Sequence, residues 1–298
     1  MKFEDLKAIC PNVLTDISLR SLTTFKIGGI AKFVCYPQNE DELKNIVSYC
    51  KKNKTSYFII GAGSNILADD NGYAGVIICT KKLKGITLLD NGKILAKSGT
   101  TLAELVQFTK NQGLSGLEWA VSIPATVGGA VVMNCGAFGG QMADIVESVK
   151  ILIDDEIVVL DKTKLFFNYR HSVFTNSKFC VIIEVLFQFT PKNIAEVTQN
   201  IREIILKRAK AQNVGFASAG SVFKKTTNLA PAYMIEKCGL KSMRVGDAMV
   251  SSVHSGYIVN VGKASCQQVL AVIDKIKIAV KEKFGEDLQL ELILLKGD

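Results

Sequence analysis

Residues 123–140 read IPATVGGAVVMNCGAFGG and hold five glycines in a segment that is otherwise mostly apolar. Flexible linkers are polar and lack Val, Ile and Met, so this segment is not a linker. Glycine has no Cβ atom and lets the backbone approach a bulky group closely. We therefore expect a turn whose amides face a ligand, with Pro124 and Thr126 fixing its direction and Asn134 offering a side-chain amide.

A second glycine-containing loop follows a predicted strand. The sequence IIGAGSNIL at residues 59–67 contains Gly61 and Gly63, but Ile66 stands where a dinucleotide-binding fingerprint requires a third glycine. Turn-forming residues come next, so no helix is expected here and a dinucleotide-binding βαβ unit is rejected. Taken alone, the loop is as consistent with a plain turn as with a phosphate-binding nest. Two such loops together suit a pyrophosphate bound from two sides.

Cysteine and histidine usage limits the chemistry of the chain. Eight cysteines occur without a Cys-x-x-Cys pair, and there are two histidines, so neither a zinc site nor a disulfide framework is expected. The N-terminus carries acids where a signal peptide has a basic head, and the apolar runs are too short to span a bilayer. These features favour a reduced, cytoplasmic protein without a membrane partner.

The formal charge of +8 calls for an anionic partner or a solvated basic surface. Lys and Arg are scattered, and their densest run, residues 202–210, has the spacing of a solvated helix face. Nucleic acid is therefore not expected as a partner. An acidic ligand in a basic cleft explains the same charge.

The periodicity of apolar residues predicts an α+β chain. Thr101 and Glu104 form a capping-box signature, and Gly113 and Gly285 are expected to end helices. The element order places a domain boundary near residues 190–212. Helices are predicted at residues 41–53, 101–113, 194–212, 230–238 and 265–284, and strands at 56–61, 75–80, 93–99, 149–160 (two strands around an Asp-Asp turn), 180–190, 256–262 and 288–295.

Six segments in this order carry a family resemblance: LTTFKIGG, GAGSNIL, IPATVGGAVVMNCGAFGG, FFNYRHSVF, SAGSVFKK and VSSVHSGYIVN. Together they resemble the UDP-N-acetylenolpyruvoylglucosamine reductase family, and the resemblance extends from about residue 20 to the C-terminus. The wider flavoenzyme group related to vanillyl-alcohol oxidase accounts for the first three segments only. The last three separate the reductase family from that group.

The resemblance implies an α+β fold with a two-part FAD-binding region of the vanillyl-alcohol-oxidase/PCMH type at residues 20–190. A connecting helix (191–212) and a smaller α+β substrate-binding domain (213–298) would follow. It also implies NADPH as the reductant, FAD as the cofactor and a UDP-sugar substrate. The enolpyruvyl ether of UDP-N-acetylglucosamine would be reduced to UDP-N-acetylmuramate for peptidoglycan synthesis, and with it for cell wall biogenesis, cell shape and cell division. The enzyme would be a monomer.

Three residues match the catalytic positions of the family. Arg170 would hold the substrate carboxylate and the enolate charge with its planar guanidinium. Ser221 would be the proton donor, and Glu291 would hydrogen-bond the enolic oxygens. Without the resemblance, each has an ordinary explanation: an ion-pair residue, a loop cap and a residue on the solvated face of a strand.

The resemblance also implies binding residues. For the substrate these are Tyr169, Lys224, Lys225 and His254. No metal ligand is expected. For FAD they are Gly61, Ala62, Gly63, Ser64, Asn65, Ser122, Ile123, Pro124, Thr126, Gly128, Gly129, Asn134, Gly136 and Ala137.

The chain departs from the family pattern at a few positions. Ala125 and Phe138 replace a glycine and a tyrosine, which does not threaten FAD binding. Lys225 stands where an asparagine is usual, and we expect its ammonium group to contact the substrate diphosphate. Gln289 replaces an acid. The short span after residue 174 leaves little room for the inserted tyrosine loop of one family form, so the shorter form is expected, with Lys225 or His254 closing over the diphosphate.

Two alternatives remain open. One is another FAD-dependent oxidoreductase on the same flavin fold, against which the last ninety or so residues argue. The other is a basic nucleotide-binding protein without catalysis, which would be colourless and would bind less tightly as salt rises.

Overall fold

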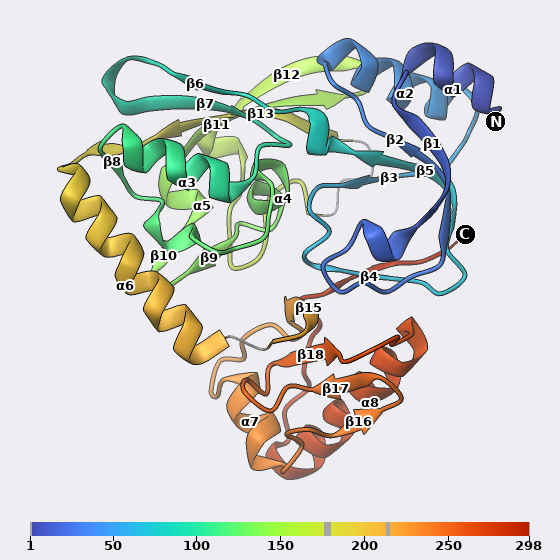
Figure 1. The fold of residues 1–298 in the computed structure, drawn as a ribbon, viewed down its shortest axis with the longest axis vertical. Coiled ribbons are helices and arrows are strands. Elements are labelled where there is room, and N and C mark those ends of the chain that lie inside the picture. The colour runs from blue at the N-terminus through green and yellow to red at the C-terminus, as the bar shows by residue number, and fades with distance from the viewer. Residues whose placement is uncertain (1, 176–179, 213–214, 298) are drawn as a thin grey trace. The chain divides into compact units, whose positions relative to one another are not determined.

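The computed structural model describes residues 2–175, 180–212 and 215–297, and each helix and strand that the sequence predicted has a counterpart in it (Figure 1). By its internal contacts the chain divides into two compact units, which we call unit 1 and unit 2. Residue 213, where the predicted C-terminal domain begins, lies outside the described residues, and the predicted domain boundaries stay a prediction. Unit 1 comprises residues 1–14, 34–62 and 76–207, and unit 2 comprises 15–33, 63–75 and 208–298.

Unit 1 contains an antiparallel five-stranded sheet. Its first two strands meet at the predicted Asp154-Asp155 turn, where both residues have positive φ angles of 49° and 64°. Positive φ at both positions gives a hairpin turn whose twist matches that of the strands. The order of the sheet is β12 (Glu156–Asp161), β11 (Val146–Ile153), β13 (Cys180–Gln188), β7 (Lys93–Lys97) and β6 (Ile86–Leu88).

Helices cover this sheet and bury their apolar faces on it. The capping box of Thr101 and Glu104 is present at the start of α3, as the sequence predicted, and Gly113 follows the helix with a φ of 63°. Val131 and Leu105 of the helices and Val185 of β13 are fully buried in one core. The helices are α3 (Leu102–Asn111), α4 (Val127–Val132), α5 (Met142–Ile145) and α6 (Ile194–Gln212).

A four-stranded sheet contains the strand that precedes Gly61. Its order is β1 (Val13–Ser18), β2 (Ile30–Cys35), β5 (Tyr73–Cys79) and β3 (Tyr57–Ile60), with β3 and β5 parallel. Strand β4 (Ile66–Ala68) follows the GAGSN loop where the sequence also predicted no helix. The remaining elements are α1 (Phe3–Ile9), α2 (Glu40–Lys52), the pair β8 (Leu114–Ser115) and β14 (Thr190–Pro191), the pair β9 (Gly136–Ala137) and β10 (Gly140–Gln141), and 3-10 turns at Leu19–Ser21, Thr80–Lys82, Asp90–Gly92, Glu118–Ala120 and Lys162–Lys164.

Unit 2 packs two helices with an antiparallel sheet and draws on three separate chain segments. Phe25, Ile27 and Leu67 from the N-terminal half are fully buried in the same core as Met234 and Val269. The predicted strand at residues 288–295 is shorter than expected, because its last residues pair in parallel with β4 while Leu290 forms an isolated antiparallel bridge to Phe223. The elements are β15 (Ala217–Ser221), β18 (Tyr257–Asn260), β17 (Ala248–Val250), β16 (Arg244–Val245), α7 (Pro231–Lys237), α8 (Cys266–Phe284) and β19 (Ile293–Leu295).

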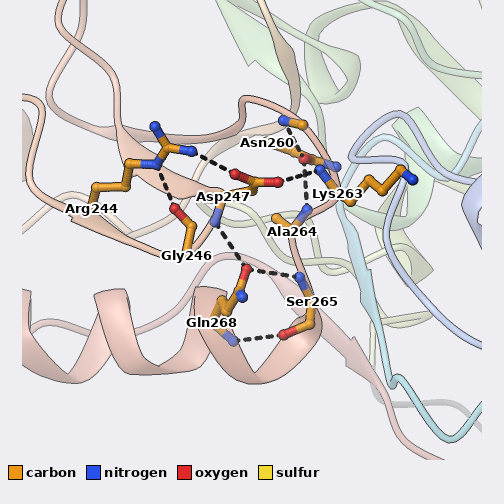
Figure 2. A network of polar contacts seen from close by, with 9 residues as sticks. Arg244, Gly246, Asp247, Asn260, Lys263, Ala264, Ser265 and Gln268 are labelled. Atoms are coloured by element: carbon orange, nitrogen blue, oxygen red, sulfur yellow. Dashed lines mark hydrogen bonds and ion pairs between the residues drawn. The ribbon is translucent and has the colours of Figure 1, made fainter.

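A polar network holds the start of α8, as Figure 2 shows. Gln268 Oε1 accepts from the backbone amides of Asp247 at 3.0 Å and Ser265 at 3.3 Å, and Ser265 Oγ accepts from Gln268 N at 3.1 Å. The carboxylate of Asp70 accepts from Cys266 N at 2.8 Å and from the next amide. The first amides of α8 are thus satisfied by side chains, which is the normal requirement of a helix N-terminus.

Among the helices described, none is both long and apolar enough to cross a bilayer. In the same part of the chain, His, Cys, Asp and Glu side chains form no group of three or more that could hold a metal ion.

Candidate active site

Gly61 and Thr126, one from each glycine-containing loop, meet in unit 1. A Cβ atom on Gly61 would overlap Thr126 Oγ1. Thr126 is 1% exposed, and its hydroxyl caps α4 by accepting from Gly129 N at 3.4 Å. A larger residue at position 61 would displace this cap, which explains the glycine. Ala62 also lies in unit 1, whereas the rest of the loop, Gly63–Asn65, lies in unit 2.

Residues 127–132 form helix α4, where the sequence analysis expected a turn. The amides of Val127 and Gly128 donate to the carbonyls of Thr100 and Ser98, both at 2.8 Å, so these two amides are not available for a ligand. A Cβ on Gly128 would lie 2.9 Å from Ser98 Cβ, so this glycine is required by packing inside the protein. At Gly129 a Cβ would have only Thr126 Oγ1 within 4 Å, at 3.5 Å. Gly129 is therefore the glycine of the pair that leaves space beside the helix.

The segments on either side of α4 are also ordered. Ser122 and Pro124 are exposed just before the helix, next to the half-buried Ile123. After it, Gly136 and Ala137 form β9, and a Cβ on Gly136 would lie 2.7 Å from the carbonyl oxygen of Gly140 in the paired strand. The hairpin, which the sequence analysis did not consider, thus accounts for this glycine.

Asn134 lies two residues after the end of α4 and is 2% exposed. Its Nδ2 donates to Gln141 Oε1 at 3.1 Å and to the carbonyl oxygen of Asn168 at 3.0 Å, and its Oδ1 accepts from Ala143 N at 2.9 Å. Both amide protons of the side chain are used inside the protein. The structure therefore gives this side chain a bracing position, and its predicted contact with FAD stays a prediction.

Arg170 lies at the tip of a two-residue hairpin. Asn168 N donates to His171 O at 3.0 Å, and His171 N donates to Asn168 O at 3.1 Å. The guanidinium carbon of Arg170 lies 5.2 Å from the centre of the Tyr169 ring, within the range of a cation–π contact. Tyr169 is 40% exposed, so its ring can also meet a ligand.

Four residues in or beside these elements of unit 1 have a left-handed backbone. The φ angles of Ser122, Asn134, Phe138 and Arg170 are 64°, 39°, 50° and 51°. Residues other than glycine adopt the left-handed region at a cost, and such residues cluster at functional sites. The strain supports a ligand-binding role for this part of unit 1.

Unit 2 brings together Ser221, Glu291 and Asn65, which are far apart in the sequence. Ser221 ends β15, and Glu291 N donates to the carbonyl of the next residue, Val222, at 2.9 Å. Asn65 Nδ2 donates to the carbonyl oxygen of Glu291 at 3.0 Å. The predicted proton donor and the predicted acid therefore lie on adjacent, hydrogen-bonded segments.

His254 lies beside the part of the unit 2 sheet that contains Ser221. Its Nδ1 accepts from Gly256 N at 3.2 Å, and its ring packs edge-on against Tyr257 with centroids 4.8 Å apart. Burial lowers the pKa of His254 below its usual value. A neutral ring whose Nδ1 accepts a hydrogen bond carries its proton on Nε2, so Nε2 is the atom that can donate to a ligand. Tyr257 is the cross-strand partner of Ser221.

The two lysines predicted to bind substrate follow Ser221 in unit 2. The backbone amide of Lys224 donates to the carbonyl of Gln289 at 2.9 Å, and its side chain is half-buried. Lys225 is exposed. The span in which the inserted tyrosine loop would lie, residues 175–179, falls outside the described residues except for Thr175.

Supporting residues were missed by the sequence analysis. Thr24 Oγ1 donates to the carbonyl of Ser218 in β15 at 2.7 Å, and Thr24 N donates to the carbonyl of Gly63 at 3.2 Å. Asn168 Oδ1 accepts from the amide of Tyr169 at 2.7 Å. Asparagine directly before a two-residue turn is a recognisable signal, and Thr24 lies in a segment that was noted only for its resemblance.

Two family models match the chain. Residues 31–160 match the FAD binding domain, and residues 212–295 match the C-terminal domain of UDP-N-acetylenolpyruvoylglucosamine reductase. These matches confirm the prediction of an FAD-binding region followed by the C-terminal domain of that reductase.

Similar proteins cover the whole chain. The UDP-N-acetylenolpyruvoylglucosamine reductase of Clostridium novyi (strain NT) is 35% identical over 94% of this chain and 91% of its own length. The protein of that name from Clostridium kluyveri is 34% identical over 100% of this chain and 99% of its own. The crystal structure of the reductase from Thermus caldophilus superimposes with a TM-score of 0.80 at 32% identity, covering 93% of this chain and 97% of that one.

Proposed function

The chain belongs to the UDP-N-acetylenolpyruvoylglucosamine reductase family, and we propose that it uses FAD and NADPH to reduce the enolpyruvyl ether of UDP-N-acetylglucosamine to UDP-N-acetylmuramate. The observation that carries this proposal is the pairing of the Ser221 and Glu291 segments through the 2.9 Å bond from Glu291 N to Val222 O. It places the two residues that distinguish this reductase from other flavoenzymes in one part of unit 2.

Unit 1 offers a fitting cradle for FAD. Gly61 and Gly129 both lie beside Thr126, and neither position has a side chain. Thr126 fills the space beside Gly61, whereas the open position of Gly129 lets a bulky cofactor approach the backbone closely. FAD, when bound, would supply the hydride chemistry for reduction of the enolpyruvyl group at its methylene carbon, with NADPH as the hydride source.

Arg170 then holds the substrate carboxylate. Its planar guanidinium can bind both carboxylate oxygens, and it stabilises the negative charge that develops when the neighbouring carbon becomes an enolate. The left-handed backbone of Arg170 at the tip of its hairpin fixes the direction of the side chain. An arginine that is placed before the substrate arrives loses less freedom on binding.

Ser221 gives its proton to the carbon that carries the carboxylate. A hydroxyl is a weak acid, but an enolate carbon is a strong base, so a hydroxyl held in position is sufficient. Glu291, with its carboxyl protonated, donates a hydrogen bond to the enolic oxygens. On the substrate side, Lys224, Lys225 and the Nε2–H of His254 contact the nucleotide diphosphate, where their charge and hydrogen-bond donors are useful.

The proposal includes a biological setting. The enzyme acts as a monomer in the cytoplasm, without a nucleic-acid or membrane partner. Its product feeds peptidoglycan synthesis, and loss of the enzyme would disturb cell wall biogenesis, cell shape and cell division.

The test is an absorbance spectrum of the purified protein. We expect flavin bands that bleach with NADPH and return, without oxygen, when the enolpyruvyl nucleotide is added. Another flavin-dependent oxidoreductase would bleach but not recover with this nucleotide, and a nucleotide-binding protein without catalysis would be colourless.

Ser221→Ala tests the proton donor. We expect bleaching by NADPH at the wild-type rate and recovery roughly 100-fold to 10,000-fold slower, since a positioned acid contributes a factor of that size. Ser218→Ala, on the same strand, is the matched control and should recover normally. Normal recovery in Ser221→Ala would remove this residue from the proposed role.

A further inference from the structure

Arg170 lies in a two-residue turn, and side chains outside this turn bind its hairpin to α4 by hydrogen bonds. The hydroxyls of Ser172 and Thr175 both donate to the carbonyl oxygen of Val132, the last residue of α4, at 2.7 Å and 3.0 Å. These bonds hold the C-terminal side of the hairpin. On its N-terminal side, the carbonyl of Asn168 accepts from the side chain of Asn134 at 3.0 Å.

The side chain of Asn134 connects three elements by hydrogen bonds. Its other amide proton goes to Gln141 at the end of β10, and its Oδ1 accepts from the amide of Ala143 in α5. The side chain is buried, and its backbone is held at a φ of 39°. A buried amide with all three bonds made has one orientation, because any rotation leaves a buried polar atom unsatisfied.

From this geometry we infer that Asn134 is a positioning residue for the reduction, which fixes the Arg170 hairpin against the end of α4. The inference rests on the proposed role of Arg170. The start of α4 is the Thr126 cap beside Gly61, so one short helix supports the predicted cofactor turn at one end and the arginine hairpin at the other. Asn134 therefore fixes the position of the arginine hairpin relative to the predicted cofactor turn.

The contact that matters is the bond from Asn134 Nδ2 to the carbonyl of Asn168. The carbonyl is also bonded to His171 N, so the hairpin itself can form without Asn134. Losing the side chain should loosen the placement of the hairpin on α4 and leave the turn intact. A displacement of about 1 Å at a positioned group can cost about 100-fold in rate.

Asn134→Asp is the first variant, because it keeps the volume and the acceptor for Ala143 N and removes both donors. Asn134→Ala is the second. Gln141→Ala is the matched control, since it removes the other partner of Nδ2 and does not touch the hairpin. Far-UV circular dichroism and melting temperature report whether each variant folds.

The first measurement is anaerobic recovery of the flavin spectrum after reduction. We expect recovery with the enolpyruvyl nucleotide to slow by roughly 10-fold to 100-fold in both Asn134 variants. Bleaching by NADPH and the oxidised flavin spectrum should be unchanged, and Gln141→Ala should recover normally. A slowing of both half-reactions together, or of the control to the same extent, would overturn the inference.

A double-mutant cycle with Arg170→Ala separates positioning from general structural damage. If Asn134 acts through Arg170, then Asn134→Asp should have less than a threefold effect in a chain that already lacks Arg170. Multiplicative effects of the two changes would overturn the inference. If the wild-type flavin does not recover at all with the nucleotide, the proposed function fails, which is a different result.

Hydrogen–deuterium exchange gives a readout that does not depend on activity. Amides in residues 165–175 should exchange faster in the Asn134 variants than in the wild type or in Gln141→Ala. Unchanged exchange there would contradict the inference. Loss of the fold in both Asn134 variants would also contradict it, because the residue would then belong to the core and not to the hairpin support.

Discussion

At the scale of single residues, the adjacent glycines of α4 differ in what a methyl group would meet. We expect Gly128→Ala to lower the free energy of unfolding by about 1–3 kcal/mol, because its Cβ would overlap that of Ser98. Gly129→Ala should instead raise it by about 0.5–1 kcal/mol, because alanine is the better helix former and the position is open. Urea unfolding of the FAD-free proteins measures both.

The same pair tests where FAD lies. If Gly129 is bare because FAD lies beside it, Gly129→Ala should bind FAD roughly tenfold or more weakly in spite of its greater stability, since an overlapping methyl group costs about 1–3 kcal/mol. Fluorescence titration with FAD measures this affinity. Wild-type affinity in Gly129→Ala would move the cofactor away from the start of α4.

His254 should make stability depend on pH. Burial lowers the pKa of His254 in the folded chain, while the unfolded chain keeps a value of about 6.5. Between the folded-state pKa and about pH 6.5 the unfolded state therefore binds a proton that the folded state does not. The stabilisation is complete above about pH 6.5 and is lost as pH falls through the folded-state pKa.

Urea unfolding at pH 7.5 and pH 5.5 tests this dependence. We expect the wild type to lose more stability on acidification than His254→Asn, which keeps an acceptor for Gly256 N. His171→Asn removes an exposed imidazole and should behave as the wild type does. Equal losses in wild type and His254→Asn would show that His254 does not titrate differently on folding.

At the scale of elements, the start of α8 depends on a residue almost 200 positions away. The carboxylate of Asp70 accepts from Cys266 N and Gln267 N at 2.8 Å and 3.1 Å. We expect Asp70→Ala to cost about 1–2 kcal/mol, since it removes both a cap and a negative charge near the positive end of the helix. Urea unfolding followed by circular dichroism measures the loss.

Asp274→Ala is the matched control for α8, because this acid is exposed in the middle of the same helix. It should change stability by less than about 0.5 kcal/mol. Ser265→Ala adds a second comparison. It removes the bond to Gln268 N, a different amide from those that Asp70 serves. Any departure of the double variant from the sum of the two costs measures the coupling between these neighbouring caps.

Elements with local signals were predictable, and those that depend on tertiary contacts were not. Helix α6 has the bounds expected from its periodicity, and Gly285 ends α8 with a φ of 73° as predicted. Helix α4 was not predicted because its two glycines have a low helix propensity. It begins at this point because Thr126 supplies its N-cap. The strand at residues 288–295 was predicted too long because segments distant in the sequence decide where it pairs: β4 for its last residues and Phe223 for Leu290.

The site follows the same division. The motifs named candidate residues, and in the structure the segments that carry Ser221 and Glu291 are hydrogen-bonded neighbours. The roles of these residues stay predictions. The bracing position of Asn134 could not be read from the sequence, because its partner is a backbone carbonyl 34 residues away. Roles that rest on such a contact become visible only when the fold is known.

At the scale of the whole molecule, unit 2 is not a continuous C-terminal piece. Its core takes Phe25, Ile27 and Leu67 from the N-terminal half, and all three are fully buried. Strand β4 from the same half pairs with β19, and Asp70 caps α8. The first 75 residues therefore contribute to both units, and they precede the five-stranded sheet of unit 1 in the sequence.

This arrangement predicts that residues 208–298 do not fold when expressed alone. Each of the three missing side chains contributes about 1.5–3 kcal/mol by burial, which together approaches the total stability of about 5–15 kcal/mol typical of a domain. We expect the fragment to show no cooperative urea transition by circular dichroism. In the full chain, Phe25→Ala should cost about 3–5 kcal/mol and still leave a transition. A fragment that unfolds cooperatively would show that these upstream side chains are dispensable, and would make residues 208–298 an independent domain.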